Sequence, residues 1–419
     1  MDITLIKKYF LFLLLTLSFT TCTKRLAVPG EDPMQGFTMD ISYLASDDLE
    51  GRETGTDGES KAAAHIKDRF KNLGLTALGD DKKEPYYQYF SKKISSNPHG
   101  TPLPDDPSIT GRNVIGLHNN NAKNTIVIGA HYDHLGYGKE GSLYTGEPAI
   151  HNGADDNASG IAALLYLAEV LSKSDIKSCN FLFIAFSGEE KGLWGSNYFI
   201  NHPTVDISTM NFMINMDMVG RLDKDRRLAI SGIGTSPVWK ELLEKTNKYK
   251  FKLKLTESGV GPSDHTSFYL NDVPVLHFFT GQHADYHKPS DDIALINFSG
   301  IRDVSHYIYA LILEVSKIEK LAFTKTKDES SDAPKFTVTL GVIPDYLYDG
   351  KGMRIDGVRE GKPAHKADLQ KGDIVITMDN QDISDMMSYM KALSSFKAGQ
   401  TVKITIIRNG KNIEKMVSF

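Results

Sequence analysis

Hydrophobic residues between positions 37 and 317 follow two alternating patterns. Short runs that are apolar at every position, such as FLFIAF, predict central strands of a sheet that helices cover on both faces. The candidate strands are NVIGL (113–117), TIVIGAH (125–131), FLFIAF (181–186), FMINMD (212–217), RLAISG (227–232) and VPVLHFF (273–279). The candidate helices lie at 58–72, 158–173, 236–248 and 299–317. This alternation without a long linker predicts one α/β domain over residues 37–320.

The apolar pattern stops at residues 321–335, where Lys, Asp, Ser and Pro predominate. A segment of this composition does not form a core, so it predicts a linker between two domains. Residues 336–419 then carry short strand-like runs and two helical pieces, near 362–368 and 383–395. They predict a second, small α+β domain.

The first residues of the chain have the pattern of an export signal. Two lysines precede the apolar run YFLFLLLTLSF, which has the length of a signal core and ends shortly before Cys22. A cysteine at this place is the usual lipid attachment site of bacterial lipoproteins, although the three residues before it depart from the usual Leu-x-Gly/Ala pattern. We expect a lipoprotein-type signal peptide over residues 1–22, lipidation at Cys22, and a location on the periplasmic side of a bacterial envelope membrane. A plain cleaved signal followed by secretion is the alternative.

Composition changes this picture little. The chain has 419 residues, of which 40% are hydrophobic and 24% charged, as expected of a soluble protein with two or more cores. Its net charge of -5 is thinly spread and it has no basic patch with interleaved aromatic residues, so nucleic acid is not an expected partner. The only cysteine besides Cys22 is Cys179, which opens an apolar strand and is expected to be buried without a disulfide.

Acidic and histidine residues gather where the predicted strands end. Open α/β sheets form their sites beyond the carboxyl ends of their strands. The residues at these positions are His131, Asp155, Asp156, Glu189, Glu190, Asp217 and His287. Imidazole and carboxylate groups are suitable zinc ligands, and two histidines with three carboxylates suffice for two ions that share a bridging carboxylate.

The adjacent Glu189 and Glu190 allow a division of roles. Two neighbouring carboxylates in one loop do not face the same metal equally well, so one can bind while the other stays free. A free carboxylate beside a metal-activated water is what a general base requires.

Five segments, GAHYDH, GADDNASG, SGEEKGLWGS, NMDMVG and YHKPSD, resemble the ordered motifs of the co-catalytic zinc aminopeptidases of clan MH. The resemblance covers about residues 37–317, and the upstream YLASDDLEGRETGTDGE resembles the N-terminal segment of many bacterial members. It implies a mixed, mostly parallel central sheet flanked by helices and a hydrolase that uses two zinc ions per chain.

The resemblance also implies a role for each matching residue. His131 and Asp217 would hold one zinc, Glu190 and His287 the other, and Asp156 would bridge them. Two further residues complete the implied machinery. Glu189 would be the general base, and Asp133 would orient the His131 imidazole.

Several alternatives remain open from the sequence. Asp155 is an alternative to the bridging Asp156, and His283 is the nearby competitor of His287. His134 is expected to form a hydrogen bond or line the substrate pocket rather than bind metal.

The segment PSDHTSF also matches the family near its substrate pocket. One interpretation is that Asp264 and His265 line the substrate pocket. The other is that Ser263 or Asp264 is the N-cap of a helix.

Residues 336–419 resemble bacterial PDZ domains through LGVIPDY, PAHKADLQKGDIV and KITIIRNGKNIEKMVSF. In such domains a peptide adds as an extra strand, and a loop of backbone N–H groups receives its terminal carboxylate. The loop residues here would be Leu340, Gly341, Val342 and Ile343. The alternative is a module that only packs on the first domain.

The sequence therefore predicts an exported zinc metallo-exopeptidase that removes N-terminal residues from peptides. The alternatives are a carboxypeptidase-type or glutaminyl-cyclase-like member of the same fold, or an inactive adaptor that binds peptides through its PDZ domain. A structural lipoprotein of the cell envelope is a further alternative, and stoichiometric zinc in the purified protein would exclude it. The cyclase is disfavoured because His131 and Asp217 leave both metal sites complete.

Overall fold

The computed structural model describes residues 33–94, 105–326, 338–345, 348, 350–359 and 361–419. The predicted signal peptide and the lipidation site Cys22 lie outside these residues. Within the described part of the chain, no helix combines the length and the apolar character needed to cross a bilayer.

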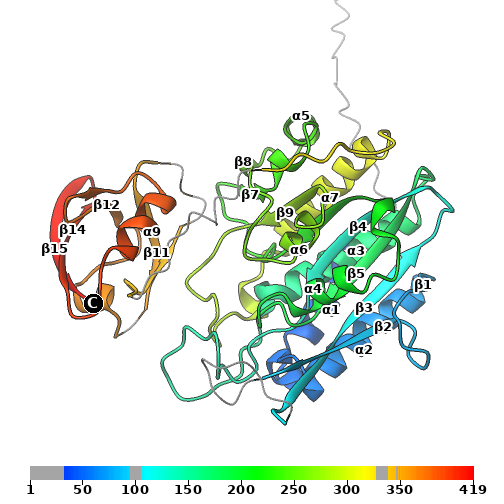
Figure 1. Cartoon of the computed structure of the whole chain (residues 1–419), viewed down its shortest axis with the longest axis horizontal. Coiled ribbons are helices and arrows are strands. Elements are labelled where there is room, and N and C mark those ends of the chain that lie inside the picture. Colours follow the sequence, from blue (N-terminus) through cyan, green and yellow to red (C-terminus); the bar gives the residue numbers. More distant parts are fainter. Residues whose placement is uncertain (1–32, 95–104, 327–337, 346–347, 349, 360) are drawn as a thin grey trace, which may run out of the picture.

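Nine strands of the described residues form the sheet of the larger domain (Figure 1). Their order is β1-β3-β5-β4-β6-β9-β7-β8, with β2 paired to β3. The strands are β1 (Thr76–Ala77), β2 (Tyr87–Lys93), β3 (Ser108–His118), β4 (Asn124–His131), β5 (Cys179–Phe186), β6 (Met210–Met216), β7 (Arg227–Ser231), β8 (Lys252–Thr256) and β9 (Val275–Phe279). The central strands β5, β4, β6 and β9 are parallel, whereas the flanking pairs β3–β5 and β7–β9 are antiparallel. The prediction of a mixed, mostly parallel central sheet is confirmed.

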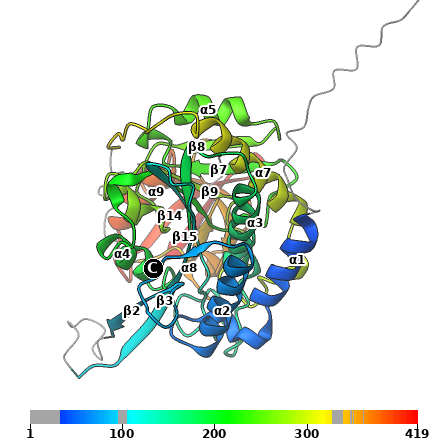
Figure 2. The same ribbon diagram turned by 90° about the vertical axis from the view of Figure 1, so that its right-hand side faces the viewer.

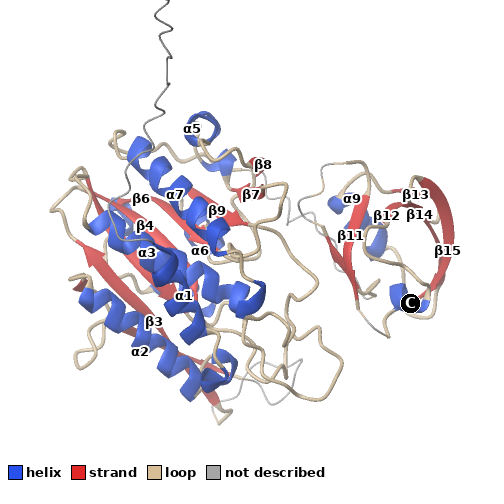
Figure 3. Ribbon diagram, turned by 180° about the vertical axis from the view of Figure 1, so that it is seen from behind, coloured by secondary structure: helices blue, strands red, loops and turns tan. Residues whose placement is uncertain are grey.

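Helices cover both faces of this sheet (Figures 2 and 3). They are α1 (Pro33–Leu44), α2 (Asp57–Asn72), α3 (Gly160–Ser172), α4 (Trp194–Asn201), α5 (Trp239–Thr246), α6 (His265–Tyr269) and α7 (Phe298–Val315). Successive side chains of a strand point to opposite faces. In β4, Ile126 and Ile128 therefore join the core under α1, α2, α3, α5 and α7, whereas Val127 joins the core under α4 and α6. Burial on both faces explains why the central strands are continuously apolar.

The C-terminal domain has a sheet of its own. Among its described residues, six strands pair antiparallel in the order β10-β11-β12-β14-β15, with β13 on β12. The elements are β10 (Val342–Pro344), β11 (Met353–Val358), α8 (Pro363–Lys366), β12 (Ile374–Met378), β13 (Gln381–Asp382), α9 (Met386–Ser394), β14 (Thr401–Arg408) and β15 (Lys411–Ser418). A separate core, which includes Leu340, Val375, Leu393 and Ile404, lies between this sheet and its helices.

Polar contacts between described residues join the two domains. The Arg227 guanidinium at the start of β7 lies 3.7 Å from the Asp345 carboxylate, which follows β10. Lys254 in β8 donates to the backbone carbonyl of Tyr348 at 3.3 Å. These contacts connect the sheet edge of the larger domain with the segment between β10 and β11.

Candidate metal centre

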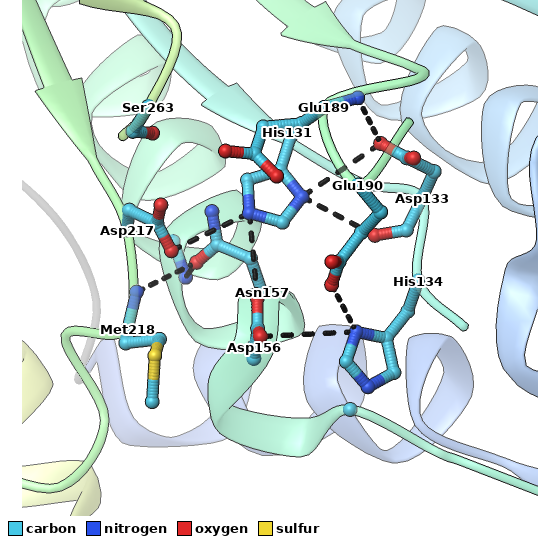
Figure 4. A network of polar contacts seen from close by, with 12 residues as sticks. His131, Asp133, His134, Asp156, Asn157, Glu189, Glu190, Asp217, Met218 and Ser263 are labelled. Carbon is cyan, nitrogen blue, oxygen red and sulfur yellow. Dashed lines mark hydrogen bonds and ion pairs between the residues drawn. The ribbon is translucent and has the colours of Figure 1, made fainter. Parts of the chain in front are cut away.

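The candidate ligands lie beyond the carboxyl ends of β5, β4, β6 and β9, which are parallel neighbours. His131 is the last residue of β4, and Asp217 directly follows β6. Glu189 and Glu190 lie in the loop after β5, and His287 lies in the loop after β9. Asp156 comes from the short helical segment η2 (Ala154–Ser159), which leads into α3. Because parallel strands end at one edge of the sheet, side chains from distant parts of the sequence meet there (Figure 4).

One group of ligand atoms forms around His131. Its Nε2 lies 3.4 Å from Asp156 Oδ1 and 3.4 Å from Asp217 Oδ1. The ligand atoms of the three side chains all lie within 4.8 Å of one another. One imidazole and two carboxylates that converge in this way fit a zinc ion with one position left open.

A second group forms around Glu190. His134, Asp156 and Glu190 have ligand atoms within 4.8 Å of one another, and His134 Nδ1 lies 2.8 Å from Glu190 Oε1. His287 Nε2 also reaches this group, at 3.2 Å from Asp156 Oδ2 and 3.2 Å from Glu190 Oε2. His287 Nδ1 faces the Gly141 carbonyl at 2.9 Å, a hydrogen bond that leaves Nε2 free to bind a metal. The structure thus places both His134 and His287 at the second group.

Asp156 belongs to both groups, because its Oδ1 lies near His131 and its Oδ2 near His287. A carboxylate that bridges two metal ions needs one oxygen directed toward each ligand group. Asp155 has other partners: Gly220 N and the Ser159 hydroxyl donate to its Oδ1 at 2.6 and 2.9 Å. Its Oδ2 faces His283 Nε2 at 3.1 Å. The geometry therefore favours Asp156 over Asp155 as the bridge and places His283 away from the ligand groups.

The site is strongly acidic. Burial raises the pKa of Glu189 well above the ordinary value; His131 opposes this rise, and the Asp217 and Glu190 carboxylates add to it. Burial disfavours a charged imidazole at His131, yet the Glu189 and Asp217 carboxylates raise its pKa well above the usual value. Burial thus dominates the pKa shift at Glu189, whereas the surrounding carboxylates outweigh burial at His131. A divalent cation bound there would compensate the charge of these carboxylates.

Asp133 connects the candidate ligand His131 with the candidate base Glu189. Its Oδ1 lies 3.7 Å from His131 Nδ1 and accepts the Glu189 backbone N–H at 3.2 Å. Its Oδ2 accepts the Thr54 hydroxyl at 2.9 Å. Asp133 is fully buried, so these partners hold it in one orientation.

Asp264, from the segment PSDHTSF, lies fully buried near this centre. Within the described residues neither of its carboxylate oxygens has a hydrogen-bond partner. Burial raises its pKa to about 7. Asp264 precedes α6 but its side chain makes no cap hydrogen bond, and the hydroxyl of Ser263 accepts instead from Asn215 Nδ2 at 2.8 Å. Asp264 therefore occupies the N-cap position of α6 without a capping hydrogen bond from its side chain.

Arg52 and Thr54 are two residues of the site that the sequence did not single out. Both lie in the segment EGRETGTDGE, which the resemblance covered only as a whole. Arg52 is fully buried, and its Nε donates to the carbonyl of Tyr132 at 2.8 Å. A charged residue amid short polar neighbours gives no sign in the sequence that it is buried.

Comparisons with known proteins confirm both resemblances. The model of peptidase family M28 matches residues 113–312, and a PDZ domain model matches residues 322–418. Aminopeptidase YwaD of Bacillus subtilis (strain 168) is 29% identical over 240 residues, which are 54% of this chain and 49% of that protein. A probable leucine aminopeptidase of Arthroderma otae is 25% identical over 222 residues, 50% of this chain and 58% of that protein. The chain thus spans about half the length of the curated relatives it matches.

Solved structures show the same fold for the larger domain. BSAP, a zinc aminopeptidase from Bacillus subtilis, superposes with a TM-score of 0.52 at 18% identity, over 70% of this chain and 96% of that chain. The glutaminyl cyclase of Bacteroides thetaiotaomicron superposes with a TM-score of 0.54 at 18% identity, over 68% and 98%. Because the neighbours include both enzyme classes, the fold does not choose between them.

Proposed function

Because residues 113–312 form a domain of peptidase family M28, we propose that this protein is an exported zinc exopeptidase that hydrolyses N-terminal peptide bonds. The observation that carries the proposal is the pair of ligand groups that share Asp156, with Glu189 in the loop beside them. We assign His131 and Asp217 to one zinc and Glu190 and His287 to the other. In this assignment His134 supports Glu190 by a hydrogen bond.

When bound, zinc supplies a Lewis acid that polarises the peptide carbonyl and lowers the pKa of water. Glu189 takes a proton from the attacking water and passes it to the leaving amine. Asp133 Oδ1 holds the backbone N–H of Glu189, and the Asp133 backbone carbonyl lies at 3.2 Å from His131 Nδ1, within hydrogen-bond distance.

The test is hydrolysis of aminoacyl-nitroanilides, N-blocked controls and acidic dipeptides by zinc-loaded protein and its Glu189→Gln variant. Loss of a general base lowers kcat by about 10²–10⁴-fold. The variant should therefore lose turnover and keep its zinc. Glu169→Gln is the matched control, because Glu169 lies on α3, where it pairs with Lys173 just beyond the helix, and it should not affect turnover. Full activity of Glu189→Gln would contradict the assigned base.

The choice between His134 and His287 as a ligand has its own test. We expect His287→Ala to lower the zinc content by about one ion per chain, because His287 Nε2 lies near both carboxylates of the second group. His134→Ala should retain zinc and weaken its binding, because the His134 imidazole lies at hydrogen-bond distance from Glu190, at 2.8 Å, but 3.9 Å from Asp156. The reverse pattern in metal analysis would make His134 the ligand.

The glutaminyl cyclase class remains a second candidate because a cyclase is among the structural neighbours. An N-terminal glutaminyl peptide in the substrate panel separates the two classes. Cyclisation releases ammonia, whereas exopeptidase action releases free glutamine. Cleavage of the acidic dipeptides without cleavage of the aminoacyl-nitroanilides would instead indicate a carboxypeptidase.

We further propose that Cys22 carries a lipid that anchors the exported protein to a bacterial envelope membrane. The proposal rests on the lysines and the apolar run that precede Cys22. Metabolic labelling with a radioactive fatty acid tests it, since wild-type protein should be labelled and a Cys22→Ala variant should not. Equal labelling of both would exclude this anchor.

For the PDZ domain we propose that a peptide C-terminus binds along β10, with its carboxylate at the loop of Leu340, Gly341, Val342 and Ile343. Within the described residues β10 is an edge strand with one unpaired side, as strand addition requires. Gly341 has a φ of +75°, a conformation that suits a tight carboxylate loop. Fluorescence polarisation with free and C-terminally amidated peptides tests the proposal, because only the free acids should bind.

A further inference from the structure

The segment from Gly51 to Glu59 lies well before the part of the chain that matches the peptidase family, yet it forms hydrogen bonds with residues 132–134, which directly follow the candidate ligand His131. Its central feature is Arg52, which is only 1% exposed. The guanidinium of Arg52 donates to four backbone carbonyls: Tyr132 at 2.8 Å, Asn152 at 2.5 Å, Gly153 at 3.1 Å and Leu44. Within the described residues it forms no ion pair with a carboxylate. The hydrogen bonds of the Arg52 guanidinium to described residues thus all go to backbone carbonyls.

The carbonyls that Arg52 binds belong to the two segments that supply both ligand groups. Tyr132 lies between the candidate ligand His131 and its partner Asp133. Asn152 and Gly153 directly precede η2, which carries Asp156. One buried guanidinium therefore connects the loop after β4 with the loop before α3. Its planar fork of five N–H donors suits this task, and a lysine has only three.

Neighbouring residues of the same segment hold the same loop. The Arg52 carbonyl accepts from His134 N at 3.3 Å. Thr54 donates to Asp133 Oδ2 at 2.9 Å. The Tyr132 hydroxyl donates to Glu59 Oε1 at 2.8 Å. Three consecutive residues, 132–134, are thus each held by a residue of the segment.

A further contact reaches the loop after β5. Glu53 forms an ion pair with Lys191 at 3.0 Å, and Lys191 directly follows the candidate ligand Glu190. The segment therefore contacts residues next to His131, residues just before η2, which carries Asp156, and the residue after Glu190.

The charge of Arg52 also suits this place. Burial lowers its pKa to about 10, and the nearby Asp156, Asp133, Asp291 and Glu190 carboxylates oppose that fall. Arg52 is therefore protonated at neutral pH. A buried cation is tolerated where it is hydrogen-bonded and faces compensating negative charge.

We propose that Arg52, assisted by Thr54, is a positioning residue that sets the separation of the ligand groups and thereby the zinc affinity and turnover of the enzyme. This inference rests on the proposed function, since the groups are taken to bind zinc. It predicts that Arg52 and Thr54 affect the metal centre itself and not only the stability of the fold.

The experiment compares full-length wild-type protein with Arg52→Lys, Arg52→Gln, Thr54→Val and Thr54→Ser. Zinc affinity is measured by competition with a chelator, kcat and KM with an aminoacyl-nitroanilide at saturating zinc, and melting temperature without zinc. Residues that orient metal ligands typically change metal affinity or activity by about 10–100-fold. We expect Arg52→Gln and Thr54→Val to lower zinc affinity and kcat in this range with little change in KM.

The conservative variants sharpen the test. Thr54→Ser keeps the hydroxyl that binds Asp133, so it should restore the wild-type zinc affinity. Arg52→Lys keeps the charge but loses the planar guanidinium, so its zinc affinity should lie between those of the wild type and Arg52→Gln. If Arg52→Gln does not fold, the Thr54 pair alone still decides the outcome.

Thr246→Val is the matched control for a purely structural effect. The Thr246 hydroxyl is buried in the same domain and donates to the Leu242 carbonyl at 2.7 Å, within α5. Its loss should lower the melting temperature and leave zinc affinity unchanged. If the Arg52 and Thr54 variants behave like this control, the proposal is overturned.

The wild-type protein separates this inference from the proposed function. A wild type that binds zinc and hydrolyses peptides, while all variants match its zinc affinity, overturns only the role of Arg52 and Thr54. A wild type that binds no zinc and hydrolyses nothing overturns the proposed function and the inference together.

Discussion

Replacing Asp133 by Asn tests whether the charge of this residue, and not its shape, prepares the metal centre. The two side chains have nearly the same size, and Asp133 is fully buried, so the packing is retained. The amide can turn its oxygen toward Glu189 N and its nitrogen toward Thr54, whose hydroxyl can rotate to accept. Both hydrogen bonds can therefore survive, and the perturbation is the loss of one negative charge.

The magnitude follows from those two hydrogen bonds and from His131. A hydrogen bond to a charged group contributes about 1.5–3 kcal/mol, compared with about 0.5–1.5 kcal/mol for a neutral one. Two weakened bonds thus cost about 2 kcal/mol. In addition, the contact of 3.7 Å with His131 Nδ1 loses its electrostatic part. A total of about 2–3 kcal/mol corresponds to about a 30–150-fold loss in zinc affinity or in kcat/KM.

Chelator competition and steady-state kinetics at saturating zinc measure this loss. Asp206→Asn is the control, because Asp206 is an exposed cap that accepts from Ser208 N at 2.8 Å. It should leave both quantities unchanged. Wild-type zinc affinity and wild-type kcat in Asp133→Asn would refute the reasoning, because the carboxylate would then contribute only its shape.

Three further predictions concern other parts of the chain. Removing zinc with a chelator should lower the melting temperature by about 5–10 °C, because one zinc at 100 times its Kd stabilises by about 2.7 kcal/mol; an unchanged temperature in differential scanning fluorimetry would contradict zinc binding. Burial raises the pKa of Cys179 to about 11, so a Cys22→Ser variant should react with a disulfide reagent at neutral pH only after urea unfolding, and reaction in the native state would contradict the burial. Gly341→Ala should destabilise the PDZ domain by about 1–3 kcal/mol and abolish peptide binding, because φ is +75° and the new Cβ would lie 2.2 Å from Lys362 Cβ; wild-type urea unfolding and affinity would refute this.

Apolar periodicity was sufficient for the central sheet and its main helices. Strands β4 and β5 are buried on both faces, so their continuous apolar runs are visible in the sequence. Strand β8, with the half-exposed sequence KLKLT, was missed because alternating charged residues resemble a surface loop. Strands β1 and β2 were missed for a similar reason, since the outer half of β2 is exposed.

In the candidate site, too, the sequence indicated some features and left others open. The sequence pointed to acidic and histidine residues at strand ends, because a sheet with parallel strands gathers such ends at one edge. It left the choice between Asp155 and Asp156 open, since the sequence does not show which of two adjacent side chains points toward the other ligands. The tertiary structure separates them, because backbone conformation turns Asp155 toward Gly220 N and Asp156 toward the histidines.

The sequence by itself determined the two domains, their fold classes and the kinds of side chain at the metal centre, because periodicity and motif order are local properties of the chain. Only the tertiary structure decided which side chains meet. Arg52 is 80 residues from Tyr132 and 101 from Gly153, and the hydrogen bonds that join them exist only once the loops around the metal centre are packed. Contacts between residues so far apart in the sequence depend on how the elements pack, and no short stretch of sequence encodes that arrangement.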